Sequence, residues 1–188
     1  MDIATDAALI VIDVQQGFDD TSFWGPRNNP GAEDRIAELV EAWQRTGRPV
    51  VVVRHTSPAG RPLAAGSPGH ALKPVVADVE AALTIEKTVN SVFYGTPDLQ
   101  EWLTRTGVRQ LVLCGIQTNM CVETTARMAG NLGYDVVVPI DATHTFDLAG
   151  PDGTVLTADE LTRATATSLH GGRFARVVPT AEVLAGIR

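Results

Sequence analysis

Six short apolar runs recur along the chain, and each has the length of a β-strand. Several of these runs are continuously apolar instead of alternating between apolar and polar residues. A parallel sheet covered by helices on both faces produces this pattern, because neither face of such a strand contacts water. The pattern therefore predicts six parallel strands, at residues 8–12, 49–53, 83–85, 110–114, 135–140 and 175–178.

The segments between the runs show the spacing of amphipathic helices. Positions 36, 39, 40 and 43 are apolar at i, i+3, i+4 and i+7, with charged residues between them, and positions 99, 102 and 103 repeat the pattern. Thr157 and Glu160 form a capping box for a helix to about residue 170, and Thr180 is expected to cap a short last helix. Strands that alternate with helices predict an open α/β sheet.

Two long stretches, residues 18–30 and 56–74, interrupt this alternation and are dense in Gly, Pro, Asn and Ser. Loops of this length inside a compact domain are often lids, pocket walls or subunit contacts. Passive surface loops are the alternative. We expect residues 56–74 to be able to complete a neighbouring pocket in a homodimer or homotetramer.

Composition and charge narrow the class of protein. The chain has 188 residues without a linker-like segment, which predicts one domain over residues 1–188. Its 44% hydrophobic and 20% charged residues are those of an ordinary globular protein. A net charge of −7, with no cluster of basic residues, argues against nucleic acid as a partner and favours a small molecule.

The beginning of the chain carries acids and lacks the cationic and apolar regions of a signal peptide, and no apolar run is long enough to span a membrane. We therefore expect a cytoplasmic protein with no membrane partner. Its two cysteines, Cys114 and Cys121, do not form a CxxC pair, and both are expected to be reduced.

Polar residues stand where three of the predicted strands end. Asp13 follows the first apolar run, Lys87 follows the third, and Cys121 lies beyond the fourth. Ligands of open parallel sheets bind at the carboxyl ends of the strands, so these side chains are candidates for one site. Each also has a structural interpretation: Asp13 could cap a loop, Lys87 could be a surface lysine, and Cys121 could be a buried packing residue.

Cys121 is expected in the first turn of a helix, where backbone amides and the helix dipole would lower its thiol pKa and could also bind an oxyanion. With a carboxylate to accept its proton and an ammonium to hold both charges, the thiol would be a catalytic nucleophile. The four histidines lack HExxH or HxH spacing, so we expect no metal site.

These residues resemble the isochorismatase-like cysteine hydrolases, which include nicotinamidases and N-carbamoylsarcosine amidases. The similarity covers most of the chain and is carried by three motifs in order, at residues 13–18, 87–96 and 115–126. It implies a six-stranded sheet of order 3-2-1-4-5-6 between helical layers and an Asp13, Lys87 and Cys121 triad. It also implies a cis peptide between Ile116 and Gln117 and an oxyanion hole from the amides of Gln117 and Cys121.

One departure from the resemblance affects the expected substrate. Nicotinamidases carry an Asp-x-His metal motif after the second strand, and here Val53 precedes Arg54 and His55. Without that ion, which anchors the pyridine nitrogen, nicotinamide loses support as a substrate, and no cofactor is expected. An apolar pocket is predicted instead, with six candidate lining residues: Phe18, Trp24, Phe93, Tyr94, His144 and Phe146. Packing in the core is the alternative role for each of them.

The resemblance implies a cysteine hydrolase that cleaves an amide or carbamoyl C–N bond of a small molecule through a thioester. One alternative is an isochorismatase, which cleaves a vinyl ether of a dianionic substrate without the cysteine; Arg54 and Arg61 could bind its carboxylates. A non-catalytic binding protein on the same fold is the third possibility.

Overall fold

The computed structural model describes residues 1–187 and contains a parallel sheet in the order β3-β2-β1-β4-β5-β9. This is the strand order that the resemblance implied, with a short additional strand, β6, paired to β4. A separate antiparallel hairpin, β7-β8, follows β6 in the chain. The strands are β1 (Ala8–Ile12), β2 (Val50–His55), β3 (Leu83–Lys87), β4 (Gln110–Ile116), β5 (Asp135–Pro139), β6 (Thr143–His144), β7 (Leu148–Ala149), β8 (Val155–Leu156) and β9 (Arg176–Val178).

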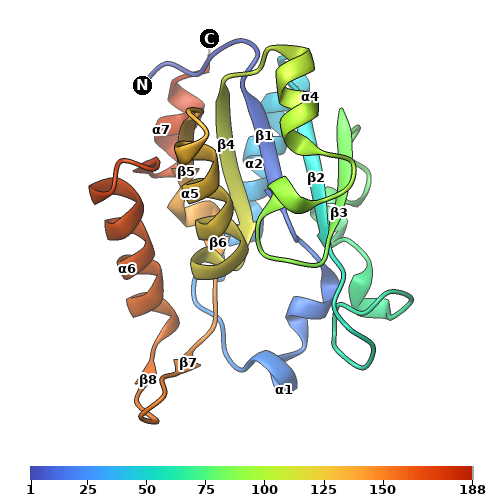
Figure 1. Ribbon diagram of the computed structural model, residues 1–188, viewed down its shortest axis with the longest axis vertical. Helices are drawn as coiled ribbons and strands as arrows, with labels where there is room; N and C mark the ends of the chain where they lie inside the picture. Colours follow the sequence, from blue (N-terminus) through green and yellow to red (C-terminus); the bar gives the residue numbers. More distant parts are fainter. Residues whose placement is uncertain (188) are drawn as a thin grey trace.

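Helices cover both faces of the sheet (Figure 1). Side chains from α4, α5 and α6 pack in the apolar cluster on one face, and those from α2, α3 and α7 pack in the cluster on the other. The helices are α1 (Thr21–Trp24), α2 (Ala32–Arg45), α3 (Pro74–Ala77), α4 (Leu99–Thr106), α5 (Glu123–Asn131), α6 (Ala158–Gly171) and α7 (Thr180–Ala185). The predicted three-layer α/β/α architecture is therefore confirmed.

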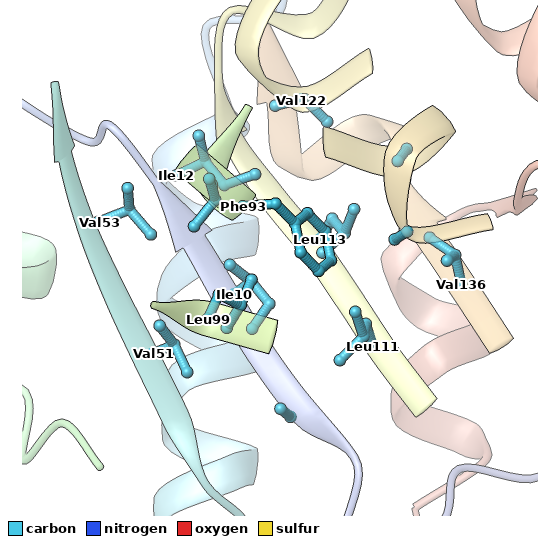
Figure 2. Close-up of a cluster of buried hydrophobic side chains, with 14 of the residues drawn as sticks. Ile10, Ile12, Val51, Val53, Phe93, Leu99, Leu111, Leu113, Val122 and Val136 are labelled. Carbon is cyan, nitrogen blue, oxygen red and sulfur yellow. The ribbon is translucent and has the colours of Figure 1, made fainter. Parts of the chain in front are cut away.

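Strand β1 lies at the centre of the sheet and shows why both faces are apolar. Ile10 and Ile12 enter the cluster beneath α4 and α5, whereas Leu9 and Val11 enter the cluster beneath α2. Because successive strand residues point to opposite faces, a strand buried on both sides needs an unbroken apolar run. Figure 2 shows the first of these clusters, in which Phe93 lies over the sheet among the strand side chains.

Three strands extend further than their apolar runs predicted. β2 continues to His55, β3 to Lys87 and β4 to Ile116, and His55 pairs with Lys87 in the register. The apolar pattern ends earlier because these two strands close with polar residues: His55 and Lys87 contact each other at the strand ends, and Arg54 approaches Glu86 outside the core.

The two predicted caps had different outcomes. The capping box of Thr157 and Glu160 is present at the start of α6. The prediction for Thr180 was wrong, because Thr180 is itself the first residue of α7. Its N–H and hydroxyl both donate to Oδ1 of Asp141 at 2.7 Å, so a distant carboxylate satisfies this helix end.

The carboxyl ends of the parallel strands lie at the end of the molecule that carries α1 and the β7-β8 hairpin, opposite the N-terminus (Figure 1). The stretch predicted as a long loop after β2 lies at the same end and contains short 3₁₀ and α-helical turns. Among residues 1–187, no helix is long and apolar enough to cross a membrane.

Candidate active site

Asp13, Lys87 and Cys121 meet at the carboxyl ends of the strands. Nζ of Lys87 lies 2.6 Å from Oδ2 of Asp13 and 3.4 Å from Sγ of Cys121. All three residues are buried. Neighbouring parallel strands place their ends side by side, which explains how residues far apart in the sequence reach one another.

Asp13 follows β1 directly and has a left-handed backbone, with φ of 54°. Its N–H donates to the carbonyl of Val53 at 3.0 Å, and its own carbonyl accepts the N–H of Gln15 at 2.8 Å. A strained conformation of this kind costs roughly 1–3 kcal/mol and persists only where the surroundings hold it. These bonds turn the chain at the end of β1 and place the carboxylate against Lys87.

Cys121 reaches the site through a tight connection after β4. Gly115 has φ of 121° and packs against the backbone of Ile12, where a Cβ atom would collide, so the position requires glycine. The Ile116–Gln117 peptide bond is cis. Residues Thr118–Val122 then form a π-helical turn that leads into α5. Cys121 therefore lies in a π-helical turn instead of the first turn of an α-helix; such turns are frequent at functional sites.

The electrostatics of Cys121 differ from the expectation of a lowered pKa. Burial raises the pKa of the Cys121 thiol, the Asp13 carboxylate raises it further, and the Lys87 ammonium opposes both effects. Burial also raises the pKa of Asp13, against the lowering effect of Lys87. The resting thiol is consequently protonated at neutral pH, and its proton must leave as it reacts.

Oδ1 of Asp13 is buried and has no hydrogen-bond partner among the described residues. A carboxylate oxygen of Asp13 lies within 4.8 Å of Sγ of Cys121. Besides accepting from Lys87, the thiol donates weakly to Oδ1 of Asn90 at 3.9 Å. The site thus contains an unpaired carboxylate oxygen close to a protonated thiol.

The arrangement of His55 bears on metal binding. Asp13, His55 and Cys121 each have one potential ligand atom, and the three atoms lie within 4.8 Å of one another. Nζ of Lys87, however, contacts all three residues, at 2.6 Å, 3.3 Å and 3.4 Å respectively. An ammonium in this position repels a second cation and occupies the ligand lone pairs, so these residues do not fit a metal centre.

A cavity of about 430 Å³ opens above Cys121. Its aromatic wall is continuous: the rings of Trp24 and Phe146 stack with centroids 5.4 Å apart, and Phe18 lies 5.0 Å from Trp24. The indole N–H of Trp24 donates to the carbonyl of Gly17 at 2.8 Å, which fixes the ring. The cavity is lined by Phe18, Phe23, Trp24, His55, Ser57, Leu63, Asn90, Gln117, Met120, Cys121, Phe146, Asp147 and Leu148.

Three of the six predicted pocket residues lie elsewhere. Phe93 packs in the core beneath α4 and α5, because its 3₁₀ turn faces the sheet (Figure 2). Tyr94 is 72% exposed and borders a separate shallow depression. His144 is fully buried on β6 behind Phe146. Phe18, Trp24 and Phe146 do line the cavity.

His144 is the buried end of a charge network beside the site that reaches the surface at Asp19. Its Nε2 lies 3.1 Å from Nη1 of Arg27, which also forms an ion pair with Glu33. Nζ of Lys73 bridges Glu33 at 2.7 Å and Asp19 at 2.5 Å. Burial lowers the pKa of His144 to about 3, with Arg27 acting in the same direction, so this histidine is neutral and accepts from Arg27. The network fixes the segment between α1 and α2 beneath the pocket.

The two arginines considered as carboxylate ligands lie outside the cavity lining. Arg54 approaches Glu86 at 3.9 Å. Arg61 is exposed and lies over the ring of Phe23, 5.4 Å from its centroid. None of the lining residues among those described is a lysine or an arginine.

Sequence reasoning missed several residues of the site. His55 stands at the end of β2 and Asn90 follows β3 closely, so the search at strand ends that selected Asp13 and Lys87 could also have selected them. Leu63 lies in a loop and Leu148 in the two-residue strand β7, and both segments are too irregular or too short for periodicity to mark a pocket residue.

Comparison with known proteins identifies the family. The Isochorismatase domain matches residues 7–170. The uncharacterized isochorismatase family protein YrdC of Bacillus subtilis is 37% identical over 180 residues, 94% of this chain and 94% of its own. A crystal structure of a putative hydrolase of the isochorismatase family from Chromobacterium violaceum superposes with a TM-score of 0.93 at 39% identity, covering 100% of this chain and 96% of that one.

Other relatives carry names of enzymes. Ureidoacrylate amidohydrolase RutB of Variovorax paradoxus is 31% identical over 177 residues, which cover 75% of this chain and 69% of RutB. Nicotinamidase 3 of Arabidopsis thaliana and streptothricin hydrolase of Streptomyces noursei are also similar. Family members thus include hydrolases that act on amide C–N bonds. The domain match and the extent of these similarities show that the chain belongs to the isochorismatase family of hydrolases.

Proposed function

We propose that the protein is a cysteine hydrolase that cleaves the C–N bond of a small, uncharged amide or carbamoyl compound. The observation that carries this proposal is the contact of Lys87 with both Asp13 and Cys121 at the floor of an apolar cavity. A thiol, a carboxylate and an ammonium in a site away from bulk water are the groups that nucleophilic acyl transfer needs.

In the first half of the reaction, the free Oδ1 of Asp13 takes the thiol proton as Sγ of Cys121 attacks the carbonyl carbon. The developing oxyanion accepts hydrogen bonds from the backbone amides of Gln117 and Cys121, both of which border the cavity. Asp13 then returns the proton to the leaving nitrogen. The C–N bond breaks, the amine or ammonia departs, and an acyl thioester of Cys121 remains.

In the second half, a water molecule attacks the thioester carbon through its oxygen, and Asp13 accepts a proton from this water. The C–S bond breaks, the thiol regains a proton from Asp13, and a carboxylic or carbamic acid leaves. The Lys87 ammonium contacts both groups and balances the charge that alternates between Asp13 and Cys121.

Replacement of the nucleophile tests this mechanism. Cys121→Ala should reduce turnover of an amide substrate to background, and mass spectrometry of the wild type with a slow substrate should detect an acyl adduct on Cys121. Cys114→Ala is the matched control, since Cys114 is buried on β4 away from the cavity. Full turnover by Cys121→Ala would refute the mechanism.

A vinyl-ether hydrolase for a dianionic substrate finds less support in the site. Two carboxylates need cationic partners, and the lining of the cavity offers neither lysine nor arginine among the described residues. Assay of isochorismate beside a panel of small amides separates the two activities. A non-catalytic binding protein would bind such compounds but release no product from either class.

A further inference from the structure

His55 completes the hydrogen bonding of the Lys87 ammonium. The three N–H groups of this ammonium face three acceptors: Oδ2 of Asp13, Sγ of Cys121 and Nδ1 of His55, the last at 3.3 Å. A lysine ammonium has donors and no acceptor, so Nδ1 of His55 must contribute a lone pair. Lys87 thereby selects the tautomer of His55.

The ring of His55 is neutral and carries its proton on Nε2. Burial lowers the pKa of His55, and the adjacent Lys87 ammonium lowers it further. In a neutral imidazole whose Nδ1 accepts, Nε2 is the donor. Rotation of the ring by 180° would replace Nδ1 with a carbon and break the contact with Lys87.

The backbone of His55 is fixed by a buried glutamine. Oε1 of Gln15 accepts the N–H of His55 at 2.8 Å, and Nε2 of Gln15 donates to the carbonyl of His55 at 3.0 Å. Gln15 itself is fully buried. The position and the tautomer of the imidazole are therefore both determined before any ligand binds.

The Nε2–H of His55 has no hydrogen-bond partner among the described residues, and His55 lines the cavity over Cys121. One ring nitrogen lies within 4.8 Å of the Cys121 sulfur. Because His55 and Cys121 line the same cavity, an acceptor bound to Nε2–H would lie in the same cavity as a carbonyl carbon under attack by that sulfur. Much of the remaining lining is aromatic or aliphatic and would contact a flat apolar body.

We infer that His55 is a substrate-binding donor and that the substrates are uncharged amides that carry a second lone-pair acceptor besides the scissile carbonyl. The acceptor can be a ring nitrogen, a carbonyl or an ether oxygen. This inference rests on the proposed function, because it takes Cys121 as the reacting group. The Nε2–H of His55 would then bind the acceptor atom of the substrate without the help of a cation.

Aldehydes test the inference without a known substrate. A thiol adds reversibly to an aldehyde carbon, and the oxygen takes up a proton to give a hemithioacetal. The probes are the 2-, 3- and 4-pyridinecarbaldehydes, each compared with benzaldehyde, which has the same shape without the ring nitrogen. Adduct affinity is measured by titration with the wild type and with His55→Phe, His55→Gln and Ser57→Ala.

Each variant is judged by the ratio of pyridine to benzaldehyde affinity, because intrinsic reactivity and any general disturbance of Lys87 affect both members of a pair. For at least one ring position, His55→Phe should lower the ratio about tenfold, the usual value of one hydrogen bond. His55→Gln, which retains an N–H, should recover part of it. Ser57→Ala, which removes another polar group of the cavity, should leave the ratio unchanged.

Failure of the inference about His55 can be distinguished from failure of the proposed nucleophile. Unchanged ratios in His55→Phe at all three ring positions would overturn the role of His55, even if Cys121→Ala forms no adduct. Adduct formation that survives in Cys121→Ala would instead contradict the proposed nucleophile. An equal fall of the pyridine-to-benzaldehyde ratio in Ser57→Ala and His55→Phe would show that the general polarity of the cavity, and not His55 itself, binds the ring nitrogen. That result would also overturn the inference.

Discussion

Asp13 and Lys87 form a completely buried ion pair, with Oδ2 and Nζ 2.6 Å apart and both side chains at 0% exposure. Removing two charges from water is costly, and their mutual attraction restores that cost only when the geometry is favourable. A pair of apolar residues of the same volume would often be as stable. The presence of the Asp13–Lys87 ion pair at the strand ends therefore suits a chemical role better than a structural one.

The cost of breaking this pair can be measured directly. Lys87→Met leaves the Asp13 carboxylate buried without its partner, so we expect a loss of about 3–5 kcal/mol in the free energy of unfolding. Asp13→Asn/Lys87→Met removes both charges and should be more stable than Lys87→Met alone. Urea denaturation of the wild type and the variants measures these values, and equal stability of the single and double variants would contradict the prediction.

Alkylation of Cys121 should show the raised thiol pKa. Because burial and Asp13 oppose ionisation, the rate of iodoacetamide labelling should still rise with pH beyond about 9.5, one unit above the usual thiol pKa of about 8.5, where the rate of an ordinary thiol levels off. Cys121 should nevertheless react faster than Cys114, which is fully buried on β4. Peptide mass spectrometry after timed labelling distinguishes the two sites. A rate at Cys121 that levels off below pH 7 would contradict the prediction.

Acid should destabilise the fold partly through His144. The unfolded chain protonates this histidine near pH 6.5, whereas the folded protein holds its pKa at about 3, although Glu33 lies 3.8 Å away. The unfolded state therefore binds more protons in this range, and stability falls as the pH decreases from 6.5 toward 3. Burial raises the pKa of Glu33, but Arg27 and Lys73 outweigh this effect and lower it from 4.5 to about 2. Stability therefore falls further as the pH decreases between those two values.

His144→Gln separates these contributions, because its amide oxygen can accept from Arg27 without titrating. The free energy of unfolding of this variant should depend less steeply on pH between 6.5 and 4.5, by up to about 1.4 kcal/mol for each unit of pH. A residual slope is expected from His55, whose pKa burial also lowers. Denaturation at several pH values provides the comparison, and parallel curves would disprove the assignment to His144.

The aromatic wall should contribute to substrate binding more than to the chemical step. Trp24→Ala removes the central ring of the wall, and we expect KM for an amide substrate to rise about tenfold or more with a smaller change in kcat. Tyr94→Ala is the matched control, since this predicted pocket residue lies on the surface outside the cavity. Steady-state kinetics should show little effect of Tyr94→Ala; an equal rise in KM for both would contradict the observed lining.

All three residues selected at strand ends meet at the site, whereas only three of the six predicted pocket residues line the cavity. Asp13 and Lys87 were found because a parallel sheet brings the ends of its strands to one edge, and that rule depends only on order along the chain. Phe93 and Tyr94 are neighbours in sequence, yet one is buried in the core and the other is exposed. Their apolar character does not indicate direction, which the 3₁₀ turn at Val92–Tyr94 decides.

The sequence by itself determined the six strands of the main parallel sheet, the helical layers and the three candidate catalytic side chains, because apolar periodicity and residue type are local properties of the chain. Only the tertiary structure decided the pKa direction of Cys121, since desolvation depends on everything packed around the thiol. It also decided the tautomer of His55, which depends on an ammonium from the adjacent strand. Charge, burial and hydrogen bonding across strands are properties of the folded assembly, and no single segment contains them.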